Sequence, residues 1–328
     1  MTDENQDLLV SVVVPTYNRA EMIGDALESI YHQDYRPIEV VVVDDGSTDD
    51  TEKTVAAWKD RHCQDSFDLR YLRQKNQGGN PARNYGISVA KGDFVAFLDS
   101  DDEWLSEKLS EQISVFKANP NTGAVYCGVR HINAATGEIT EPAGRQYPSG
   151  KIFDQIIIRD VTSPTSAYMI RREVFERVGD FDVTLQARQD WDMWIRIASK
   201  YRIDCVPKAL VNYREHPGER TASDPTKEMK AYSRIMEKYQ DLREAQSWTV
   251  RRAAESAYYK RMGRVSFHQR ISWLKAVGYL SKALITWPFD FDTWAALLGV
   301  IIPRGVRGVL HRLWNRFFGK TPLAIRSH

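Results

Sequence analysis

Apolar and polar positions follow two alternating patterns along the first hundred residues. Short β-branched runs, each closed by a turn, predict buried strands over residues 9–14, 38–43, 69–73 and 94–98. Between them, apolar residues recur at helical spacing, which predicts helices over residues 20–33 (with Asn18 as N-cap), 51–59 and 82–90. Strands that alternate with helices indicate an α/β fold with a mainly parallel central sheet flanked by helices.

The second half of the chain changes from a mixed pattern to a helical one. Up to residue 213 the pattern predicts strands over residues 124–129, 167–170 and 202–206 and helices over 171–178 and 190–200. Beyond the Asp224-Pro225 turn the spacing is helical, over residues 226–240 and 248–264, with a break at Trp287-Pro288. We therefore expect two domains, an α/β domain over residues 1–224 and a helical C-terminal region over residues 225–328.

Three carboxylates follow the fourth predicted strand directly, in Asp99-Ser100-Asp101-Asp102. In an α/β sheet, the carboxyl ends of the strands open into the ligand crevice. Carboxylates this close repel one another unless a cation lies between them, and Mg²⁺ or Mn²⁺ carrying phosphate oxygens is the common solution. The alternative for such a short motif is a solvated acidic loop or the N-cap of the next helix.

The other predicted strand ends carry polar groups suited to a nucleotide. Tyr17 offers a ring face on which a base could stack, and Asp45 could accept a hydrogen bond from a uracil imide or a ribose hydroxyl. Arg83 could donate to phosphate or base oxygens. The alternatives are an ordinary turn tyrosine, a helix N-cap at Asp45 or Ser47, and a surface salt bridge. Together these groups indicate a pocket for a nucleoside diphosphate held through a metal.

Four motifs in consistent order resemble the family 2 glycosyltransferases, which have the GT-A fold. They are Val-Val-Val-Pro-Thr-Tyr-Asn-Arg (12–19), Val-Val-Val-Asp-Asp-Gly-Ser-Thr-Asp (41–49), Ala-Arg-Asn-Tyr-Gly-Ile (82–87) and Phe-Leu-Asp-Ser-Asp-Asp (97–102). The resemblance extends over residues 10–223, about two thirds of the chain. It implies a nucleotide-sugar donor, a divalent metal and inversion at the anomeric carbon in a single displacement.

The resemblance also implies roles for individual residues on the donor side. The nucleotide would be bound by Pro15, Tyr17, Arg19, Asp45, Arg83, Asp99 and Ser100. Within this set, Tyr17 resembles the base-stacking residue and Asp45 the uracil contact. Asp101 and Asp102 would hold Mn²⁺ or Mg²⁺, which bridges the diphosphate, with Asp101 as the first choice of ligand.

A further motif, Gln189-Asp190-Trp191-Asp192-Met193-Trp194, resembles the family's Glu-Asp-Trp-Asp-x-Trp. Asp190 matches the general base that takes the proton from the acceptor hydroxyl, while the metal supplies positive charge to the departing diphosphate. A carboxylate at the start of a helix should stay ionised at neutral pH. Gln189 stands where the family has Glu. The alternatives are a helix N-cap at Asp190 and core packing for Trp191 and Trp194.

Two other segments resemble family features. Residues 212–218 resemble a flexible segment that closes over the donor, which makes His216 a ligand of the metal or of the diphosphate and Arg214 and Arg220 phosphate partners. An isolated histidine in a polar loop can also be simply solvated. The acceptor side is expected to comprise Ser163, Thr165, Gln189 and Trp191.

Charge and cysteine content exclude some classes of protein. The 45 Lys and Arg nearly balance the 44 Asp and Glu, so that net charge does not favour a nucleic-acid partner. Cys63, Cys127 and Cys205 show no metal-ligand spacing and are typical of reduced thiols. The acidic, polar N-terminus predicts no signal peptide, and no run reaches the ~18–20 apolar residues that span a bilayer. We therefore expect a cytoplasmic protein.

The C-terminal segment is basic and aromatic. Residues 301–328 contain no acidic residue, and their basic residues are Arg304, Arg307, Arg312, Arg316, Lys320 and Arg326. A helix over residues 305–320 would place apolar residues on one side and most arginines on the other, which suits an anionic membrane interface. The alternative is a helix docked on the protein with a solvated basic face. Membrane binding would place the protein peripherally on the inner face and favour a lipid-linked acceptor.

The sequence thus predicts a metal-dependent inverting glycosyltransferase of surface polysaccharide or glycoconjugate synthesis. Its donor would be a UDP-sugar, in preference to a GDP- or dTDP-sugar, and its acceptor a glycan or a lipid-linked sugar. A haloacid-dehalogenase-type phosphatase also carries D-x-D after a strand, but there a small residue and Thr or Val follow, where this chain has Asp102-Glu103. A non-catalytic module that binds nucleotide sugars or glycans on the same scaffold is the other alternative.

Overall fold

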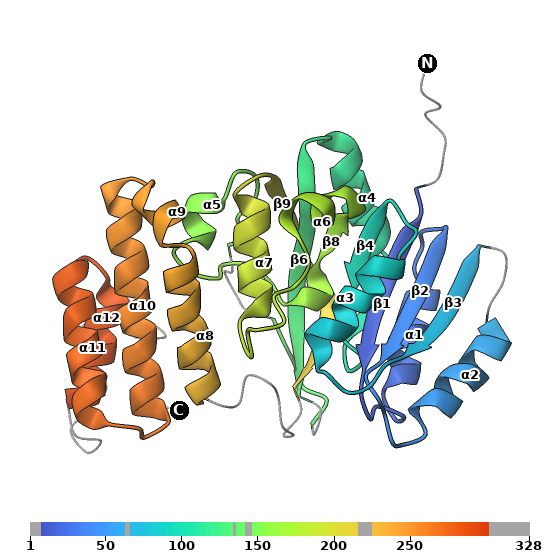
Figure 1. Ribbon diagram of the computed structural model, residues 1–328, viewed down its shortest axis with the longest axis horizontal. Helices are drawn as coiled ribbons and strands as arrows, with labels where there is room; N and C mark the ends of the chain where they lie inside the picture. Colours follow the sequence, from blue (N-terminus) through green and yellow to red (C-terminus); the bar gives the residue numbers. More distant parts are fainter. Residues whose placement is uncertain (1–7, 63–65, 134–135, 142–145, 216–224, 302–328) are drawn as a thin grey trace. The chain divides into compact units, whose positions relative to one another are not determined.

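The computed structural model describes residues 8–62, 66–133, 136–141, 146–215 and 225–301 (Figure 1). The chain divides into two compact units. Unit 1 comprises residues 1–156, 160–185 and 189–219, and unit 2 comprises residues 157–159, 186–188 and 220–328.

Unit 1 is built on one nine-stranded sheet within the described residues. Its strands are β1 (Val10–Thr16), β2 (Ile38–Asp44), β3 (Phe67–Arg73), β4 (Phe94–Phe97), β5 (Glu103–Trp104), β6 (Thr122–Asn133), β7 (Ile139–Thr140), β8 (Met169–Arg171) and β9 (Arg202–Glu215). They are ordered β3-β2-β1-β4-β8-β6-β9-β5, with β7 on β6. Strands β3, β2, β1 and β4 are parallel, as are β6 and β9, whereas β8 is antiparallel to both of its neighbours. The expected α/β fold with a mainly parallel sheet is confirmed.

Helices cover both faces of the sheet (Figure 1). Those of unit 1 are α1 (Ile23–Tyr31), α2 (Thr51–His62), α3 (Gly79–Val89), α4 (Lys108–Ala118), α5 (Phe153–Ile156), the 3₁₀ helix η1 (Thr165–Ala167), α6 (Arg172–Val178) and α7 (Gln189–Ala198). Val12 of β1 joins the core formed with α1, α2 and α4, whereas Val13 faces α3. A Cβ at Gly86 would lie 2.3 Å from Val13 Cγ1, so that α3 packs closely on the sheet. Strands buried on both faces explain the unbroken valine runs of the sequence.

Unit 2 is helical, as the sequence predicted. Its helices are α8 (Pro225–Lys238), α9 (Gln240–Glu244), α10 (Trp248–His268), α11 (Trp273–Thr286) and α12 (Phe291–Ile301). The side chains of Ser247 and Ser272 cap α10 and α11. No helix in the described part of the chain is both long and apolar enough to cross a bilayer.

Two local expectations are wrong. Asn18 does not cap the first helix, because α1 begins only at Ile23; instead its side-chain oxygen accepts a hydrogen bond from the Thr48 backbone N–H at 2.8 Å. Residues 212–215 are not a flexible loop, because β9 continues to Glu215 between β6 and β5. Both differences arise from pairing with residues distant in sequence.

Candidate active site

The acidic segment forms a tight turn at the carboxyl end of β4. It is closed by a 3.0 Å hydrogen bond from the Asp102 backbone N–H to the Asp99 carbonyl. Helix α4 begins only at Lys108, so that the turn is not the N-cap of a helix. The carboxylates therefore lie at the sheet edge where β1, β2 and β4 all end.

Asp102 is the buried member of this acidic turn. Its Oδ2 accepts a 2.6 Å hydrogen bond from Ser166 Oγ, and its Oδ1 accepts one from the Arg214 backbone N–H at 3.3 Å. Burial, together with the negative charges of Asp99 and Asp101, raises the pKa of Asp102 well above its usual value. Arg83 pairs with Asp99, and Arg19 lies near Asp101; a bound cation would add further positive charge beside the acidic turn.

The donor set of the turn fits Mn²⁺ or Mg²⁺ if the substrate supplies the remaining ligands. The described residues contain no group of three or more His, Cys, Asp or Glu side chains arranged around a metal position. Mg²⁺ in nucleotide sites is usually held by one or two carboxylates together with substrate phosphates and water. Asp101 and Asp102 are the two carboxylates that the sequence analysis expects in this role.

Two arginines flank the acidic turn. Arg83 of α3 donates through Nη2 to Asp99 Oδ1, and its guanidinium lies 6.0 Å from the Phe181 ring centroid. Arg19, just beyond β1, places Nη2 4.0 Å from Asp101 Oδ2. The salt bridge considered for Arg83 thus exists, and its partner is a carboxylate of the turn.

Ser166 is the site residue that the sequence analysis did not single out. Besides donating to Asp102, its hydroxyl oxygen accepts from the Asp99 backbone N–H at 3.1 Å. Its carbonyl accepts from Trp104 Nε1 at 2.8 Å. Ser166 therefore joins η1 to both ends of the acidic turn. In sequence it is one hydroxyl among several between residues 162 and 166, and nothing local marks its partner.

Asp45 holds the loop that leads into α3. Its carboxylate accepts hydrogen bonds from the backbone N–H groups of Gln77 and Gly78, at 2.8 and 2.7 Å, and from Gln74 Nε2 at 2.7 Å. It is therefore not a helix N-cap. Its predicted contact with uracil stays a prediction, and any such contact would share a carboxylate that already accepts three hydrogen bonds.

We expect Asp45→Ala to lower the free energy of unfolding by about 2 kcal/mol, because two backbone donors and one amide lose their acceptor. Urea denaturation measures this difference. Asp50→Ala is the matched control, since Asp50 is exposed and pairs with Lys53 on the surface; we expect a change of less than about 0.5 kcal/mol there. Equal effects of the two substitutions would contradict the anchoring role of Asp45.

The remaining donor-side residues differ in accessibility. Tyr17 follows β1 and is 43% exposed, so that its ring is available for stacking. Pro15 is buried within β1 opposite Val43, and Ser100 is buried in the acidic turn. The predicted contact between Pro15 and the donor stays a prediction.

Asp190 lies toward the same edge of the sheet as the acidic turn. Strand β9 runs in the direction of β4, because both β4 and β6 are antiparallel to β8 and β9 is parallel to β6. Helix α7 lies along the sheet and leads through residues 199–201 into the start of β9 (Figure 1). Its first turn, with Asp190, is therefore directed to the edge where the strands end. Asp190 Oδ1 accepts a 2.8 Å hydrogen bond from the Trp191 backbone N–H.

The predicted acceptor side needs one clear correction. Trp191 is 1% exposed and donates from Nε1 to the Ile156 carbonyl at 2.8 Å, so that it packs in the core and does not face an acceptor. Trp194, assigned to the core, stacks on Tyr168 with ring centroids 3.5 Å apart. Gln189 donates to the Leu185 carbonyl. Ser163 and Thr165 are buried in and beside η1, and Ser163 Oγ has no hydrogen-bond partner among the described residues.

Arg214 also departs from its prediction. Its guanidinium donates to Glu103 and, at 3.2 Å, to Asp25 Oδ2, and its backbone N–H donates to Asp102. The Arg214 side chain therefore joins β9 to β5 and α1. In this structure its partners are these carboxylates, whereas the sequence predicted a phosphate. His216 and Arg220, like the basic segment over residues 302–328, lie outside the described residues.

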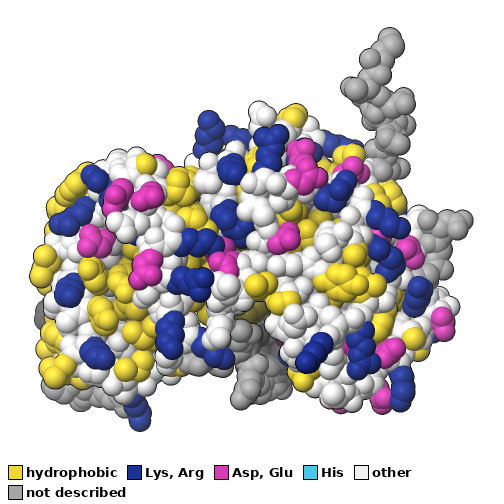
Figure 2. All heavy atoms as spheres, viewed as in Figure 1, with side chains coloured by type: hydrophobic (Ala, Val, Ile, Leu, Met, Phe, Trp, Pro, Cys, Tyr) yellow, Lys and Arg dark blue, Asp and Glu magenta, His cyan; other side chains and the backbone are white. Residues whose placement is uncertain are grey.

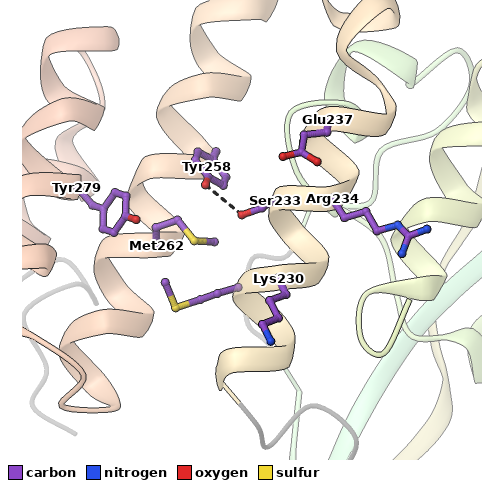
Figure 3. A pocket seen from close by; sticks show the side chains of 8 residues that line it. Lys230, Ser233, Arg234, Glu237, Tyr258, Met262 and Tyr279 are labelled. Carbon is purple, nitrogen blue, oxygen red and sulfur yellow. Dashed lines mark hydrogen bonds between the residues drawn. The ribbon is translucent and has the colours of Figure 1, made fainter. Parts of the chain in front are cut away.

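Unit 2 carries a groove of about 520 Å³ that differs in chemistry from the acidic turn (Figure 3). It is lined by Met229, Lys230, Ser233, Arg234, Glu237, Tyr258, Met262 and Tyr279. Ser233 Oγ and Tyr258 Oη lie 3.1 Å apart across it. With one carboxylate among its lining residues, the groove offers no site for a metal-bound diphosphate, and the acidic turn remains the candidate active site.

The region that contains the acidic turn is similar to known proteins. The family model "Glycosyl transferase family 2" matches residues 11–179. An uncharacterized glycosyltransferase of Rickettsia felis is 35% identical over 223 residues, which cover 67% of this chain but only 35% of that protein. The amylovoran biosynthesis glycosyltransferase AmsB of Erwinia amylovora is 30% identical over 227 residues, which cover 65% of this chain and 74% of AmsB. The chain therefore matches about a third of the Rickettsia protein's length.

Two solved structures share the fold. Staphylococcus aureus TarS 1–349, in complex with UDP-GlcNAc, superposes with a TM-score of 0.65 and 21% identity, over 88% of this chain and 84% of that one. The mannosyltransferase PcManGT of Pyrobaculum calidifontis, in complex with GDP-Man and Mn²⁺, gives a TM-score of 0.55 and 22% identity, over 94% and 87%. At these identities the likeness concerns the fold alone.

Proposed function

The chain belongs to glycosyl transferase family 2, and from this premise we propose that it moves a sugar from a nucleotide-diphosphate donor to a hydroxyl group of a glycan or lipid-linked acceptor. One observation carries the proposal. The acidic turn and the first turn of α7 are directed to the same edge of one sheet, within the same compact unit. An inverting transferase needs carboxylates on both sides of the anomeric carbon. The acidic turn would serve the donor, and Asp190 in the first turn of α7 would serve the acceptor.

On the donor side, the ends of β1 and β4 would hold the nucleotide. Tyr17 offers its exposed ring to the base, and Arg19 and Arg83 provide guanidinium donors beside the acidic turn. Arg83 is positioned by its pairing with Asp99, and Asp45 shapes the loop that precedes α3. These groups would fix the diphosphate at the carboxyl edge of the sheet.

Asp101 and Asp102 would hold a divalent cation together with the donor's phosphates. When bound, the cation supplies positive charge that stabilises the diphosphate as it departs. Ser166 and the Arg214 backbone N–H orient the Asp102 carboxylate for this purpose, since each donates to one of its oxygens. Mn²⁺ is present in the PcManGT complex, which supports a metal of this class.

On the acceptor side, Asp190 would take the proton of the incoming hydroxyl while its oxygen attacks C1 of the sugar. The new C1–O bond forms as the bond from C1 to the diphosphate breaks, so that the configuration at C1 inverts. Asp190 stands in the first turn of α7. The neighbouring Trp191 is buried and donates from Nε1 to the Ile156 carbonyl, which joins the first turn of α7 to the end of α5.

A UDP-sugar is the donor that we favour, supported by the UDP-GlcNAc bound to TarS. Surface polysaccharide synthesis is supported by the relative AmsB, which acts in amylovoran biosynthesis. The second candidate function is a module that binds nucleotide sugars or glycans without transfer, which the Gln189 substitution in the α7 motif favours. Asp190 and the complete acidic turn favour the enzyme.

A thermal-shift panel of UDP-, GDP- and dTDP-sugars, each with and without Mn²⁺, tests donor binding. We expect one nucleotide class at about a hundred times its Kd to raise the Tm by about 5 °C in the presence of Mn²⁺. EDTA should reverse the shift, and the free sugar alone should cause none. If no nucleotide sugar changes the Tm under any of these conditions, the proposed donor site is wrong.

A further inference from the structure

A cavity of about 790 Å³ opens at the edge of the unit 1 sheet that lies opposite the acidic turn. Strands β6 and β9 begin at this edge, with Thr122 and Arg202, and β8 ends there, with Arg171. Because β6 and β9 run in the direction of β4, their first residues lie at the edge away from the end of β4. The cavity is therefore separate from the candidate active site. Its volume is in the range of small-molecule sites, about 300–1,000 Å³.

Cationic side chains from several segments of unit 1 line this cavity. Figure 2 shows Lys and Arg side chains along the upper edge of this unit. Among the described residues that line the cavity, Glu173 is the one carboxylate. The cationic residues, which we call the basic cluster, are Lys151, Arg171, Arg177, Lys200 and Arg202.

Two arginines of the basic cluster are held in place by hydrogen bonds to the protein. Arg171 donates from Nε to the Thr122 carbonyl at 2.9 Å and from Nη2 to the Phe116 carbonyl at 3.3 Å. Arg202 donates from Nη2 to Asp204 Oδ1 at 3.0 Å, and the Thr122 hydroxyl donates to the same carboxylate. Both guanidinium groups are thus fixed around Thr122, so that binding an anion there costs little side-chain entropy.

The hydrogen-bond partners leave the basic cluster with a net positive charge. Arg171 and Lys200 donate to backbone carbonyls, which carry no net charge; Lys200 Nζ lies 2.7 Å from its acceptor. Burial lowers the pKa of the Arg171 guanidinium, so that its charge is poorly solvated. Glu173 and Asp204 offset two of the five positive charges of the cluster, which leaves three.

Lys151 and Arg177 are the members of the cluster whose charges are most accessible. Both are exposed, and no ion pair engages either side chain within the described residues. Their ammonium and guanidinium groups are therefore available to a ligand without the loss of an existing salt bridge.

The amount of charge around one cavity indicates the class of ligand. Three net positive charges match a ligand that concentrates several negative charges in a small volume, and guanidinium groups bind phosphate through paired N–H donors. We propose that the basic cluster binds a small ligand that carries two or more phosphate groups. Phe153 and Tyr201, which also line the cavity, offer ring faces to the remainder of the ligand. The proposal goes beyond the transfer reaction and does not depend on it.

Isothermal titration calorimetry of the full chain with tripolyphosphate tests this site. EDTA is present throughout, because it removes the metal through which the acidic turn would bind a diphosphate. The variant is Lys151→Gln combined with Arg177→Gln. We expect the wild type to bind tripolyphosphate, more weakly at raised salt, and the Kd of the variant to be at least about tenfold higher.

The matched control is Lys59→Gln combined with Arg61→Gln, which removes one exposed lysine and one exposed arginine from α2 of the same unit. It should bind tripolyphosphate like the wild type. The Mn²⁺-dependent thermal shift by the sugar-nucleotide donor should be the same in all three proteins, so that the two sites are tested separately.

Four results would overturn the proposal. The first is no binding of tripolyphosphate to the wild type. The second is equal binding by the wild type and the cluster variant, with circular dichroism showing both folded, which would place the ion elsewhere. The third is an equal affinity for citrate, which would show that the cluster does not select phosphate. The fourth is binding to phosphatidylglycerol vesicles in preference to free tripolyphosphate, lost in the variant, which would make a lipid headgroup the source of the phosphate.

Discussion

We expect Asp190→Asn to lower the rate of sugar transfer by a factor of about 10²–10⁴, the range that loss of a general base produces. The amide is isosteric with the carboxylate and can still accept the hydrogen bond from the Trp191 N–H, so that the first turn of α7 should keep its structure. An amide cannot take the acceptor proton. Donor binding, measured by thermal shift with Mn²⁺, should therefore remain while kcat falls.

The control for this substitution is Glu176→Gln, which removes one exposed carboxylate from α6 of the same unit. It should leave kcat within about twofold of the wild type. Transfer by Asp190→Asn at the wild-type rate would exclude Asp190 as the base, and loss of donor binding together with transfer would indicate a structural role.

The second large effect concerns the metal. We expect Asp101→Asn to abolish the Mn²⁺-dependent thermal shift by the donor and to lower kcat/KM by about 10²–10³-fold, because the cation loses a carboxylate ligand and the diphosphate loses its counter-charge. Asp101 is the better target than Asp102. Asp102 is buried and accepts hydrogen bonds from Ser166 and from the Arg214 backbone N–H. Its substitution would therefore disturb the acidic turn, η1 and β9 together.

Asp50→Asn is the matched control for the metal experiment, since it also removes one carboxylate but on the exposed surface near Lys53. Its Mn²⁺ titration should coincide with that of the wild type. A titration of activity against Mn²⁺ distinguishes a weakened site, which more metal rescues, from a missing one. If Asp101→Asn responds to Mn²⁺ as the wild type does, Asp101 is not a ligand and the proposed metal position is wrong.

The sequence alone determined the class of fold and the place of the acidic turn. Runs such as Val40 to Val43 are continuous because β2 is buried on both faces, and a run of that kind has few other stable conformations in water. The residues directly after such a strand must lie at its carboxyl end. The local pattern therefore located Tyr17, Asp45 and Asp99 at one sheet edge without any knowledge of strand order.

Tertiary structure decided which of those polar groups are already engaged. Asp45 binds the loop before α3, Arg214 joins β9 to β5, and Trp191 turns into the core. The hydrogen bond between Asp102 and Ser166 joins residues that are 64 positions apart in the sequence. These hydrogen bonds depend on strand register and on close packing between segments that are distant in sequence. The interaction energies that decide which group each side chain pairs with arise only in the folded chain. Residue type and spacing therefore indicate where chemistry can occur, while packing decides which side chains remain available for it.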